Sequence, residues 1–425
     1  MIYNISDHLL MVTNVILREG ENQSLEEKRQ KEHILLYKIL FSFMIMLLYM
    51  IGRNIPLYGV DIDAYRNVDV NAQSVIMHAL SGDMRNCSIF ILGLWPYMLA
   101  SMLAVLVMAI KSLDNTSKIS PKKMNVWTIT IMMVIASVQA FLKTQTLIYK
   151  SEGNELLLTK IIVFIQLITG MLIVIYMCER VTKYGIGGRT SIFMVNIVDG
   201  MFTMLGKARG DELLIPIVIG IVEIAVMIFL ETTEKRIAVQ RVSIHNIYAD
   251  KNYIAYKLNP IGVMPLMFAS AVFLVPQFFT NMLSEWNPQN GELAWVAENM
   301  KLTSTLGICT YLGIICILNI TFSLIILSPG KTSEDLLKSG DSILDVYAGK
   351  PTKRYLVGTV LRFSMYSSIV ICICQGIPLF LQFEGLINPA LAMLPCSIMM
   401  CTGIWISFYR EARVYRNMDR YRPIV

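Results

Sequence analysis

The chain has 425 residues, of which 55% are hydrophobic and 16% are charged, and its formal net charge is +6. Soluble domains are about a quarter charged. The low charge, together with a mean hydropathy of +0.56, excludes a soluble globular enzyme and indicates an integral membrane protein.

The first 33 residues predict a cytoplasmic tail with one amphipathic helix. In "SDHLLMVTNVILREG", Ser6 and Asp7 can cap a helix ahead of an apolar repeat that ends at Gly20. The tail holds no long apolar run, and the first run after it lacks a small-residue cleavage site. We therefore expect no cleavable signal peptide.

Apolar runs of about 20 residues, the length that a helix needs to cross a bilayer, recur ten times after this tail. They lie at about 35–52, 87–110, 126–146, 158–179, 190–206, 213–231, 261–283, 303–328, 357–380 and 390–409. The sequence therefore predicts an all-α membrane protein with ten transmembrane helices.

The lysines and arginines of the connecting segments predict the orientation, because cytoplasmic connections are enriched in these residues. If both termini are cytoplasmic, 26 of the 37 lysines and arginines lie in cytoplasmic segments and nine in outer segments. The other two, Lys38 and Arg362, lie at the ends of spans. This distribution favours a multi-pass membrane protein with both ends in the cytoplasm.

Ten spans divide into two halves of five, and an odd number per half requires the second half to be inverted, a common plan among transport proteins. The expected halves are 34–210 and 211–409, followed by a basic cytoplasmic tail, 410–425. The second and seventh spans support the division, because "LGLWPYMLASML" (Leu92–Leu103) and "IGVMPLMFASAV" (Ile261–Val272) both place a proline beside small residues. A match this short can also arise by chance.

A half-length amphipathic helix is expected directly before the second span, in "NAQSVIMHALSGD" (Asn71–Asp83). Its apolar residues share one helical face. A helix of about 11 residues is roughly 16 Å long, whereas the hydrocarbon core is about 30 Å thick. This segment therefore cannot span the membrane.

No motif for catalysis or for a cofactor is present. The chain lacks HExxH, GxSxG and a Walker loop. The glycine-rich "YGIGGRT" (Tyr184–Thr190) could be read as a nucleotide site, but it lacks the Lys-Ser/Thr end of a phosphate loop and fits the start of a membrane helix better. The eight cysteines make no metal-ligand spacing with the four histidines, so we expect buried cysteines, no metal and no enzymatic activity.

Two acidic residues fall within predicted spans, Asp199 in the fifth and Glu223 in the sixth. No lysine, arginine or histidine is expected at a similar depth to pair with them. We expect both carboxylates to be hydrogen-bonded within the bundle or to face a wet cavity, rather than to bind a coupling ion.

Several motifs, in order along nearly the whole chain, resemble those of the SecY protein-conducting channel family. They are "KILFSFMIMLLYMIGRNIPLYGVDI", "SIFILGLWPYMLASML", "YGIGGRTSIF", "EKRIAVQ", "KLNPIGVMPLMFAS" and "GKPTKRYL". The resemblance implies two inverted five-helix halves around a central pore, through which secretory proteins cross the membrane.

The resemblance implies that the half-length helix is a plug that closes the pore from outside at rest. The plug would span 72–82, with Gly82 as a hinge. The residues assigned to it are Ala72, Val75, Ile76, Ala79, Leu80 and Gly82. An interfacial helix on the outer leaflet is the alternative.

The resemblance also implies a ring of apolar side chains that seals the pore. Carried over by motif, the ring consists of Leu94, Met98, Met194, Val198, Met267 and Met400. Unbranched methionines can close around varied chains, although these residues could also serve ordinary helix packing. The lateral gate, which opens to lipid beside the second, third and seventh spans, is assigned to Leu99, Gln139 and Val275.

The cytoplasmic loops depart from the family pattern. Tyr347 and Ala348 occupy the positions of an Arg-Pro pair that engages the motor ATPase, and the loop after the sixth span is shortened. The residues expected to face a motor are Lys235, Arg236, Arg241, Tyr347, Lys350, Lys353 and Arg354. These departures resemble the accessory SecY of Gram-positive bacteria.

That resemblance implies as partners an accessory SecA-type motor, a small SecE-like subunit, accessory secretion proteins and the lipid bilayer, and no nucleic acid. The substrates would be unfolded preproteins, such as glycosylated serine-rich adhesins. Two alternatives remain: a secondary transporter of a small solute that uses Asp199 or Glu223, and an insertase or scaffold without a pore.

Overall fold

The computed structural model describes residues 34–61, 87–113, 121–150, 154–208, 210–241, 253–286, 295–296, 299–389 and 391–420. These residues form ten helices of at least 19 residues, and each overlaps one of the ten expected spans. They are α2 (Ile34–Gly52), α4 (Trp95–Leu113), α5 (Pro121–Thr146), α6 (Asn154–Tyr184), α7 (Gly188–Lys207), α8 (Leu214–Thr232), α9 (Met264–Trp286), α11 (Thr305–Leu327), α13 (Lys350–Phe383) and α14 (Leu394–Arg420).

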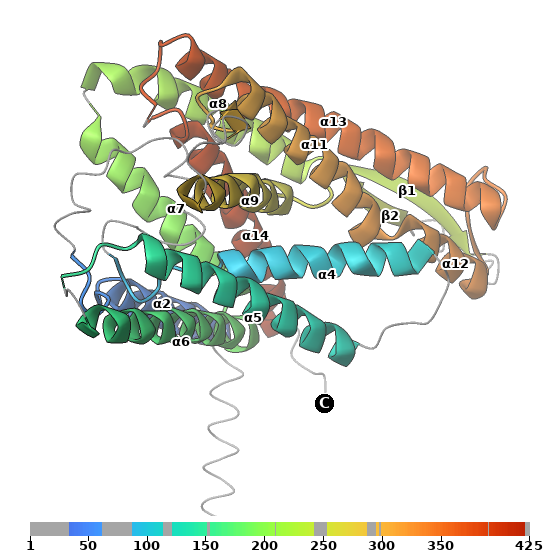
Figure 1. Ribbon diagram of the computed structural model, residues 1–425. Helices are drawn as coiled ribbons and strands as arrows, with labels where there is room; N and C mark the ends of the chain where they lie inside the picture. The colour runs from blue at the N-terminus through green and yellow to red at the C-terminus, as the bar shows by residue number, and fades with distance from the viewer. Residues whose placement is uncertain are drawn as a thin grey trace, which may run out of the picture.

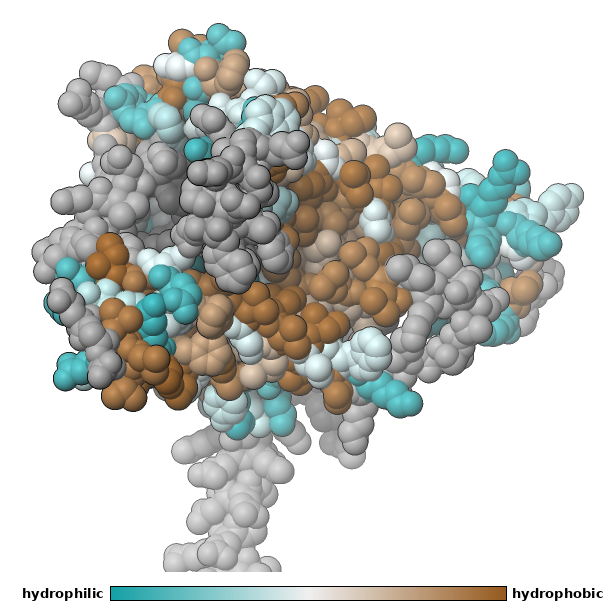
Figure 2. Space-filling view, in the orientation of Figure 1, coloured by the Kyte–Doolittle hydropathy of each residue, from teal (hydrophilic) through white to brown (hydrophobic). Residues whose placement is uncertain are grey.

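Six helices of the described chain, α2, α5, α6, α8, α11 and α13, are long and apolar enough to cross a membrane. Within α4 and α9 the apolar stretches are shorter, Trp95–Val107 and Met264–Pro276. Large apolar side chains are exposed along the outward faces of the long helices, such as Leu158 in α6 and Ile221 in α8. Figure 2 shows this apolar surface over the middle of the molecule, with hydrophilic residues toward both ends, including the end that carries the strands. A bilayer accounts for such a surface, since soluble monomers rarely expose contiguous apolar patches of this extent.

The two halves of the chain meet along α4 and α9. Figure 1 shows α2, α5 and α6 on one side of the molecule and α8, α11 and α13 on the other, with α4 and α9 next to each other between them. Within the second half, α11 packs along α13 and α8 along α14. Helix α14 also reaches into the first half and packs against α7 and α2.

One end of the bundle gathers segments that were expected to be cytoplasmic. The Arg410 guanidinium of α14 binds Glu231 at the end of α8 at 2.8 Å. The Glu411 carboxylate accepts a hydrogen bond of 2.9 Å from the Gly187 amide, at the start of α7. Lys38, near the start of α2, lies over the Tyr415 ring at 4.4 Å.

The opposite end gathers segments that were expected to be outside. Val60 pairs with Tyr149 in an isolated β-bridge, although the two residues lie in different loops. The Asn388 amide, which follows α13, donates to Glu212 before α8 at 3.1 Å. Consecutive long helices therefore run alternately between the two ends, as the ten-span prediction requires.

A small sheet at the first end was not predicted. Strand β1 (Glu234–Arg241) pairs antiparallel with β2 (Tyr253–Lys257) and with β3 (Asp341–Ile343), in the order β2-β1-β3. The loop between α8 and α9 thereby joins the loop that follows α11 and the short helix α12 (Pro329–Ser339). Alternate residues of β1, Ile237 and Val239, are buried, and this period-two pattern in "EKRIAVQ" is the sequence signal that was missed.

Two helix boundaries differ most from the expected spans. The second apolar run starts at 87, but α4 begins only at Trp95, because Cys87 and Gly93 adopt positive φ angles of 40° and 52° and Ser88 pairs with Pro56 in a β-bridge. At the other end of the chain, α14 does not stop near 409 but continues to Arg420. The first part of the basic tail is thus a helical extension of the last span.

The glycine-rich "YGIGGRT" runs from the last residue of α6 through a turn into the start of α7, the helix start that the sequence indicated. Gly187 precedes this helix with a φ of 78°, a left-handed conformation that favours glycine. A Cβ at Gly187 would lie 2.1 Å from the Phe408 ring of α14. Glycine therefore permits both the turn and the close approach of α14.

Candidate functional site

The contact between α4 and α9 is one junction of the two halves, and the packing of α14 on α7 and α2 is the other. Trp95, the first residue of α4, is 4% exposed, and its indole Nε1 donates a hydrogen bond of 3.0 Å to the carbonyl of Ala271 in α9. Pro96 occupies the second position of α4, where a helix needs no amide donor. The side chains around this junction belong to one large buried apolar cluster that includes residues from both halves.

Four of the six predicted ring residues, Leu94, Met98, Met267 and Met400, are buried members of this cluster. Met194 packs against it from α7 and is partly buried, and Val198, one turn later, is also partly buried. The ring residues come from the segment before α4 and from α4, α7, α9 and α14. The structure therefore places four of them in the shared apolar interior and Met194 at its edge.

The three predicted gate residues lie on helices around the same junction. Leu99 of α4 and Val275 of α9 are partly buried and pack against the large cluster. Gln139 is buried in α5, which packs on α4, and its Nε2 has no hydrogen-bond partner among the described residues.

Polar contacts connect the end of α2 with α7 beside this interior. One of them contradicts the expectation that Asp199 has no cation nearby. Arg53, directly after α2, binds the Asp199 carboxylate of α7 at 2.7 Å. The expectation that no cation would lie at the depth of Asp199 was wrong, because a charge at the end of one span was not recognised as a partner for a carboxylate within another. The Tyr49 hydroxyl, one turn before Arg53, donates to Asn196 at 2.8 Å.

Glu223 has a different environment. Its side chain is buried in α8, and neither carboxyl oxygen has a hydrogen-bond partner among the described residues. The thiols of Cys374 in α13 and Cys396 in α14 lie close enough to interact electrostatically with it. The expected hydrogen bond within the bundle is therefore not formed among the residues that the structure describes.

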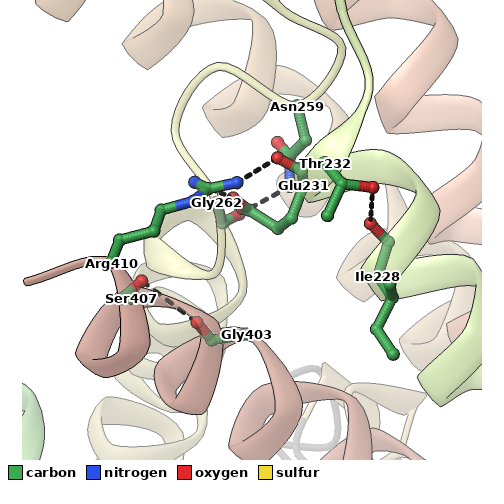
Figure 3. Close-up of polar contacts among 8 residues, drawn as sticks. All are labelled: Ile228, Glu231, Thr232, Asn259, Gly262, Gly403, Ser407 and Arg410. Carbon is green, nitrogen blue, oxygen red and sulfur yellow. Dashed lines mark hydrogen bonds and ion pairs between the residues drawn. The ribbon is translucent and has the colours of Figure 1, made fainter. Parts of the chain in front are cut away.

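An ion pair between a buried carboxylate and a partly exposed arginine connects α8 and α14, at the corner where both meet α9 (Figure 3). Glu231 is buried, and Arg410 donates both to its carboxylate, at 2.8 Å, and to its backbone carbonyl. Asn259 donates from its side chain to the Gly262 carbonyl at 3.0 Å. A Cβ at Gly262 would lie 2.7 Å from a Glu231 carboxylate oxygen, and the φ of Gly262 is 74°.

Lys257, at the end of β2, adds a second cation to this corner. Burial is the main cause that lowers the pKa of Lys257, and the charge of Arg410 lowers it further, whereas Glu231 raises it. On α14, Gly403 allows close packing, since a Cβ there would lie 1.8 Å from a Val263 methyl carbon. These contacts connect the start of β1 and the end of β2 to α14, the last span.

The sheet brings two of the predicted motor-facing loops together as one platform, defined here as β1, β2, β3, α12 and the turn 344–349. Its inner face packs on the ends of α11 and α13 through Ile237, Tyr256 and Ile343. The described basic side chains on its outer surface are exposed. They are Lys235, Arg236, Lys331 and Lys338, and the predicted Lys350, Lys353 and Arg354 are exposed directly after the platform, at the start of α13.

Tyr347 protrudes from this platform. Its side chain is 88% exposed. Its backbone carbonyl accepts a hydrogen bond of 2.8 Å from Thr352, and the neighbouring Gly349 carbonyl accepts one of 3.2 Å from Ser333. The turn is therefore fixed by the protein while the aromatic ring is directed into solvent.

Two predictions concern residues outside the described ranges, and a third concerns a side chain of β1 whose environment is not described. The plug, 72–82, lies between the described segments that end at 61 and begin at 87. The amphipathic helix of the N-terminal tail precedes residue 34, and the side-chain environment of Arg241 is likewise not described.

Comparison with known proteins identifies the family. The SecY family model matches residues 88–409. The accessory Sec system protein translocase subunit SecY2 of Streptococcus agalactiae serotype Ia is 27% identical over 403 residues, covering 93% of this chain and 97% of the relative. The subunit of the same name from Staphylococcus epidermidis is 27% identical over 409 residues, covering 93% and 98%.

Solved structures have the same fold. A structure described as that of a protein conducting channel superposes with a TM-score of 0.66 at 16% identity, covering 92% of this chain and 95% of the other. Sec61 from the canine ribosome-channel complex superposes with a TM-score of 0.62 at 15% identity, with the same coverage. Because the family model covers most of the chain and the folds agree, the chain belongs to the SecY family of multi-pass protein-conducting channel subunits.

Proposed function

We propose that this chain is the channel subunit of an accessory Sec translocase in a bacterial plasma membrane. Unfolded preproteins would cross the membrane between its two halves. The full-length similarity to accessory SecY2 subunits of Streptococcus and Staphylococcus supports this assignment. The end that carries the platform would face the cytoplasm together with both termini, since lysines and arginines are concentrated in the segments assigned to that side.

The path would run through the apolar interior at the α4–α9 junction. The six ring residues would close around the translocating chain, and the segment 72–82 would cover the outer side at rest. Separation of α4 from α9, beside Leu99, Gln139 and Val275, would release apolar signal segments to lipid. Burial of four ring residues in a cluster shared by both halves supports this path.

A dedicated SecA-type motor would bind the platform. The observation that carries this proposal is the exposed Tyr347 ring on a turn held by hydrogen bonds. An arginine at this position could form bidentate, charge-assisted bonds with motor carboxylates, whereas tyrosine offers one hydroxyl and an aromatic face. A motor that recognises an arginine would therefore bind this platform poorly, and a motor with an apolar pocket for Tyr347 would bind it well.

The remaining partners follow from the family. A small SecE-like membrane subunit and accessory secretion proteins would complete the translocase, and glycosylated serine-rich adhesins are the expected substrates. A small-solute transporter is not favoured, because Asp199 is already paired with Arg53 and Glu223 is enclosed. A scaffold without a pore would tolerate polar residues in the ring, which distinguishes it from a channel.

Binding of the two motors to the purified channel tests the proposal. We expect the cognate accessory motor to bind tightly and the housekeeping SecA to bind at least tenfold more weakly. Tyr347→Ala should weaken cognate binding by about tenfold or more, as for an aromatic residue at the centre of an interface, where ~1.4 kcal/mol corresponds to a factor of ten. Replacing Tyr347 and Ala348 with Arg and Pro should weaken cognate binding as well.

Tyr58→Ala is the matched control, because Tyr58 is also well exposed but lies at the opposite end of the bundle. It should leave binding of both motors unchanged. Equal affinity of the unmodified channel for the two motors would contradict the dedicated-motor proposal and leave the family assignment intact.

A further inference from the structure

The end of α2 holds α7 by two directional contacts. The Tyr49 hydroxyl donates to Asn196 at 2.8 Å, and the Arg53 guanidinium binds the Asp199 carboxylate at 2.7 Å. The Arg53 amide donates to the Tyr49 carbonyl at 3.0 Å, so helical hydrogen bonding continues through Arg53 and the two side chains share one face. On α7, Asn196 and Asp199 also share a face, because they are three positions apart. The two contacts therefore lie one turn apart along both helices.

The chemistry of these contacts indicates that they fix a position rather than merely add stability. Tyr49, Arg53 and Asn196 are buried, and the Asp199 side chain is partly exposed. Taking a guanidinium out of water is costly, and apolar side chains of similar volume often stabilise a fold as well as a buried ion pair does. Apolar packing has no preferred direction, whereas a charge-assisted hydrogen bond has one. The ion pair therefore restricts how α7 can shift along α2.

The same end of α2 also holds the segment 87–94, which precedes α4. The Tyr49 ring stacks on the Phe90 ring, with the centroids 5.6 Å apart and an angle of 2° between the planes. Gly52 permits this approach, since a Cβ there would lie 2.2 Å from a carbon of the Phe90 ring. The backbone directly after α2 is also hydrogen-bonded to this segment. One helix end thus contacts two separate parts of the first half.

These two parts carry four of the six ring residues. Leu94 is the last residue of the segment before α4, and Met98 follows one turn later. On α7, Val198 directly precedes Asp199, and Met194 lies one turn before Val198. The end of α2 supplies no ring residue itself. Because methionine side chains are flexible, the tightness of the ring depends on how firmly the backbones that carry them are held.

We propose that the end of α2 is a brace, consisting of Tyr49, Gly52 and Arg53, that positions the first half's side of the ring and so keeps the resting channel closed to ions. Tyr49 and Arg53 are positioning residues, because they act through the ring side chains of their neighbours. If Arg53 releases Asp199, α7 can shift against α2, and a gap opens in the ring that water and ions can enter. This inference rests on the proposed channel function.

The resting ion conductance of the full-length channel, reconstituted in a planar bilayer, tests the brace. Arg53→Glu places two carboxylates opposite each other and Asp199→Lys places two cations, so each should raise conductance about tenfold. The two substitutions together restore the attraction in reverse, and conductance should return to within about twofold of that of the unmodified channel. Asp199→Asn, which keeps the size of the side chain and removes its charge, should raise conductance about threefold.

Two comparisons separate positioning from general damage. Structural losses would add in the double variant, whereas a restored pair makes them cancel. Arg410→Ala is the matched control, because it removes the ion pair between α8 and α14 and should leave resting conductance unchanged. A leak from Arg410→Ala as large as that from Arg53→Glu would overturn the brace. Unchanged conductance of Arg53→Glu and Asp199→Asn would overturn it too, as would a double variant that does not recover.

The ring itself provides the reference for these measurements. Replacing Met98 and Met267 with asparagine tests the ring without touching the brace. If this ring variant leaks and the brace variants do not, the brace is wrong and the ring stands. If the ring variant does not leak, the ring assignment falls, and with it the proposed path on which the brace rests.

Discussion

Replacing Met98 and Met267 with asparagine should raise the resting ion conductance of the reconstituted channel by about tenfold or more. The two methionines belong to the apolar interior shared by the halves. An ion that enters this interior must lose its hydration shell, and thioethers and methyl groups offer little in return. Each amide would supply a hydrogen-bonding partner, and hydrogen bonds to charged groups are worth roughly 1.5–3 kcal/mol. Conductance of proteoliposomes in a planar bilayer measures the effect.

Two controls separate sealing from general damage. Replacing the same methionines with leucine keeps the volume and the apolar character, so conductance should stay at the level of the unmodified channel. Met171→Asn places an amide at an equally buried methionine of α6, in a different cluster. A leak from the Met171 variant as large as that from the ring variant would contradict the ring assignment, and so would unchanged conductance of the ring variant.

Removing Arg410 should lower the free energy of unfolding by about 2–4 kcal/mol. Breaking a fully buried ion pair costs roughly 3–5 kcal/mol. The expected loss is somewhat smaller because Arg410 is itself partly exposed. Glu231 is 3% exposed in its side chain, and Arg410→Ala would leave it with Lys257 as the nearest cation. The loss should appear as a fall of several degrees in the thermal unfolding temperature of the purified protein.

Arg413→Ala is the matched control, because Arg413 is exposed on the same helix one turn later. The double variant Glu231→Met with Arg410→Met should recover much of the lost stability, because it leaves no buried charge unpaired. A melting temperature of Arg410→Ala equal to that of Arg413→Ala would show that the corner in Figure 3 contributes little to stability.

The ten helices could be predicted because each span is a long apolar run, and a bilayer leaves few other structures for such a run. Their boundaries were less predictable. Residues 87–94 are as apolar as a span, but the chain there turns at Cys87 and Gly93 and pairs with Pro56. Apolar composition alone does not distinguish such a segment from a helix.

The contacts that matter most for the site depend on tertiary structure. Arg53 and Asp199 are 146 positions apart, and Trp95 and Ala271 are 176 apart. No local pattern links either pair. The sheet had a local signal in β1, but its third strand is only the three residues Asp341–Ile343, too short to be recognised without its partner.

Site-specific photo-crosslinking during export tests the central claim most directly, namely that substrate passes between the two halves at the ring. A photoreactive residue would replace Met267 or Met400 in the apolar interior, or Ile221 on the exposed face of α8. With a substrate arrested in transit by a folded C-terminal domain, Met267 and Met400 should crosslink to the arrested chain and Ile221 should not. Crosslinks at Ile221 without crosslinks at the two ring positions would contradict the account.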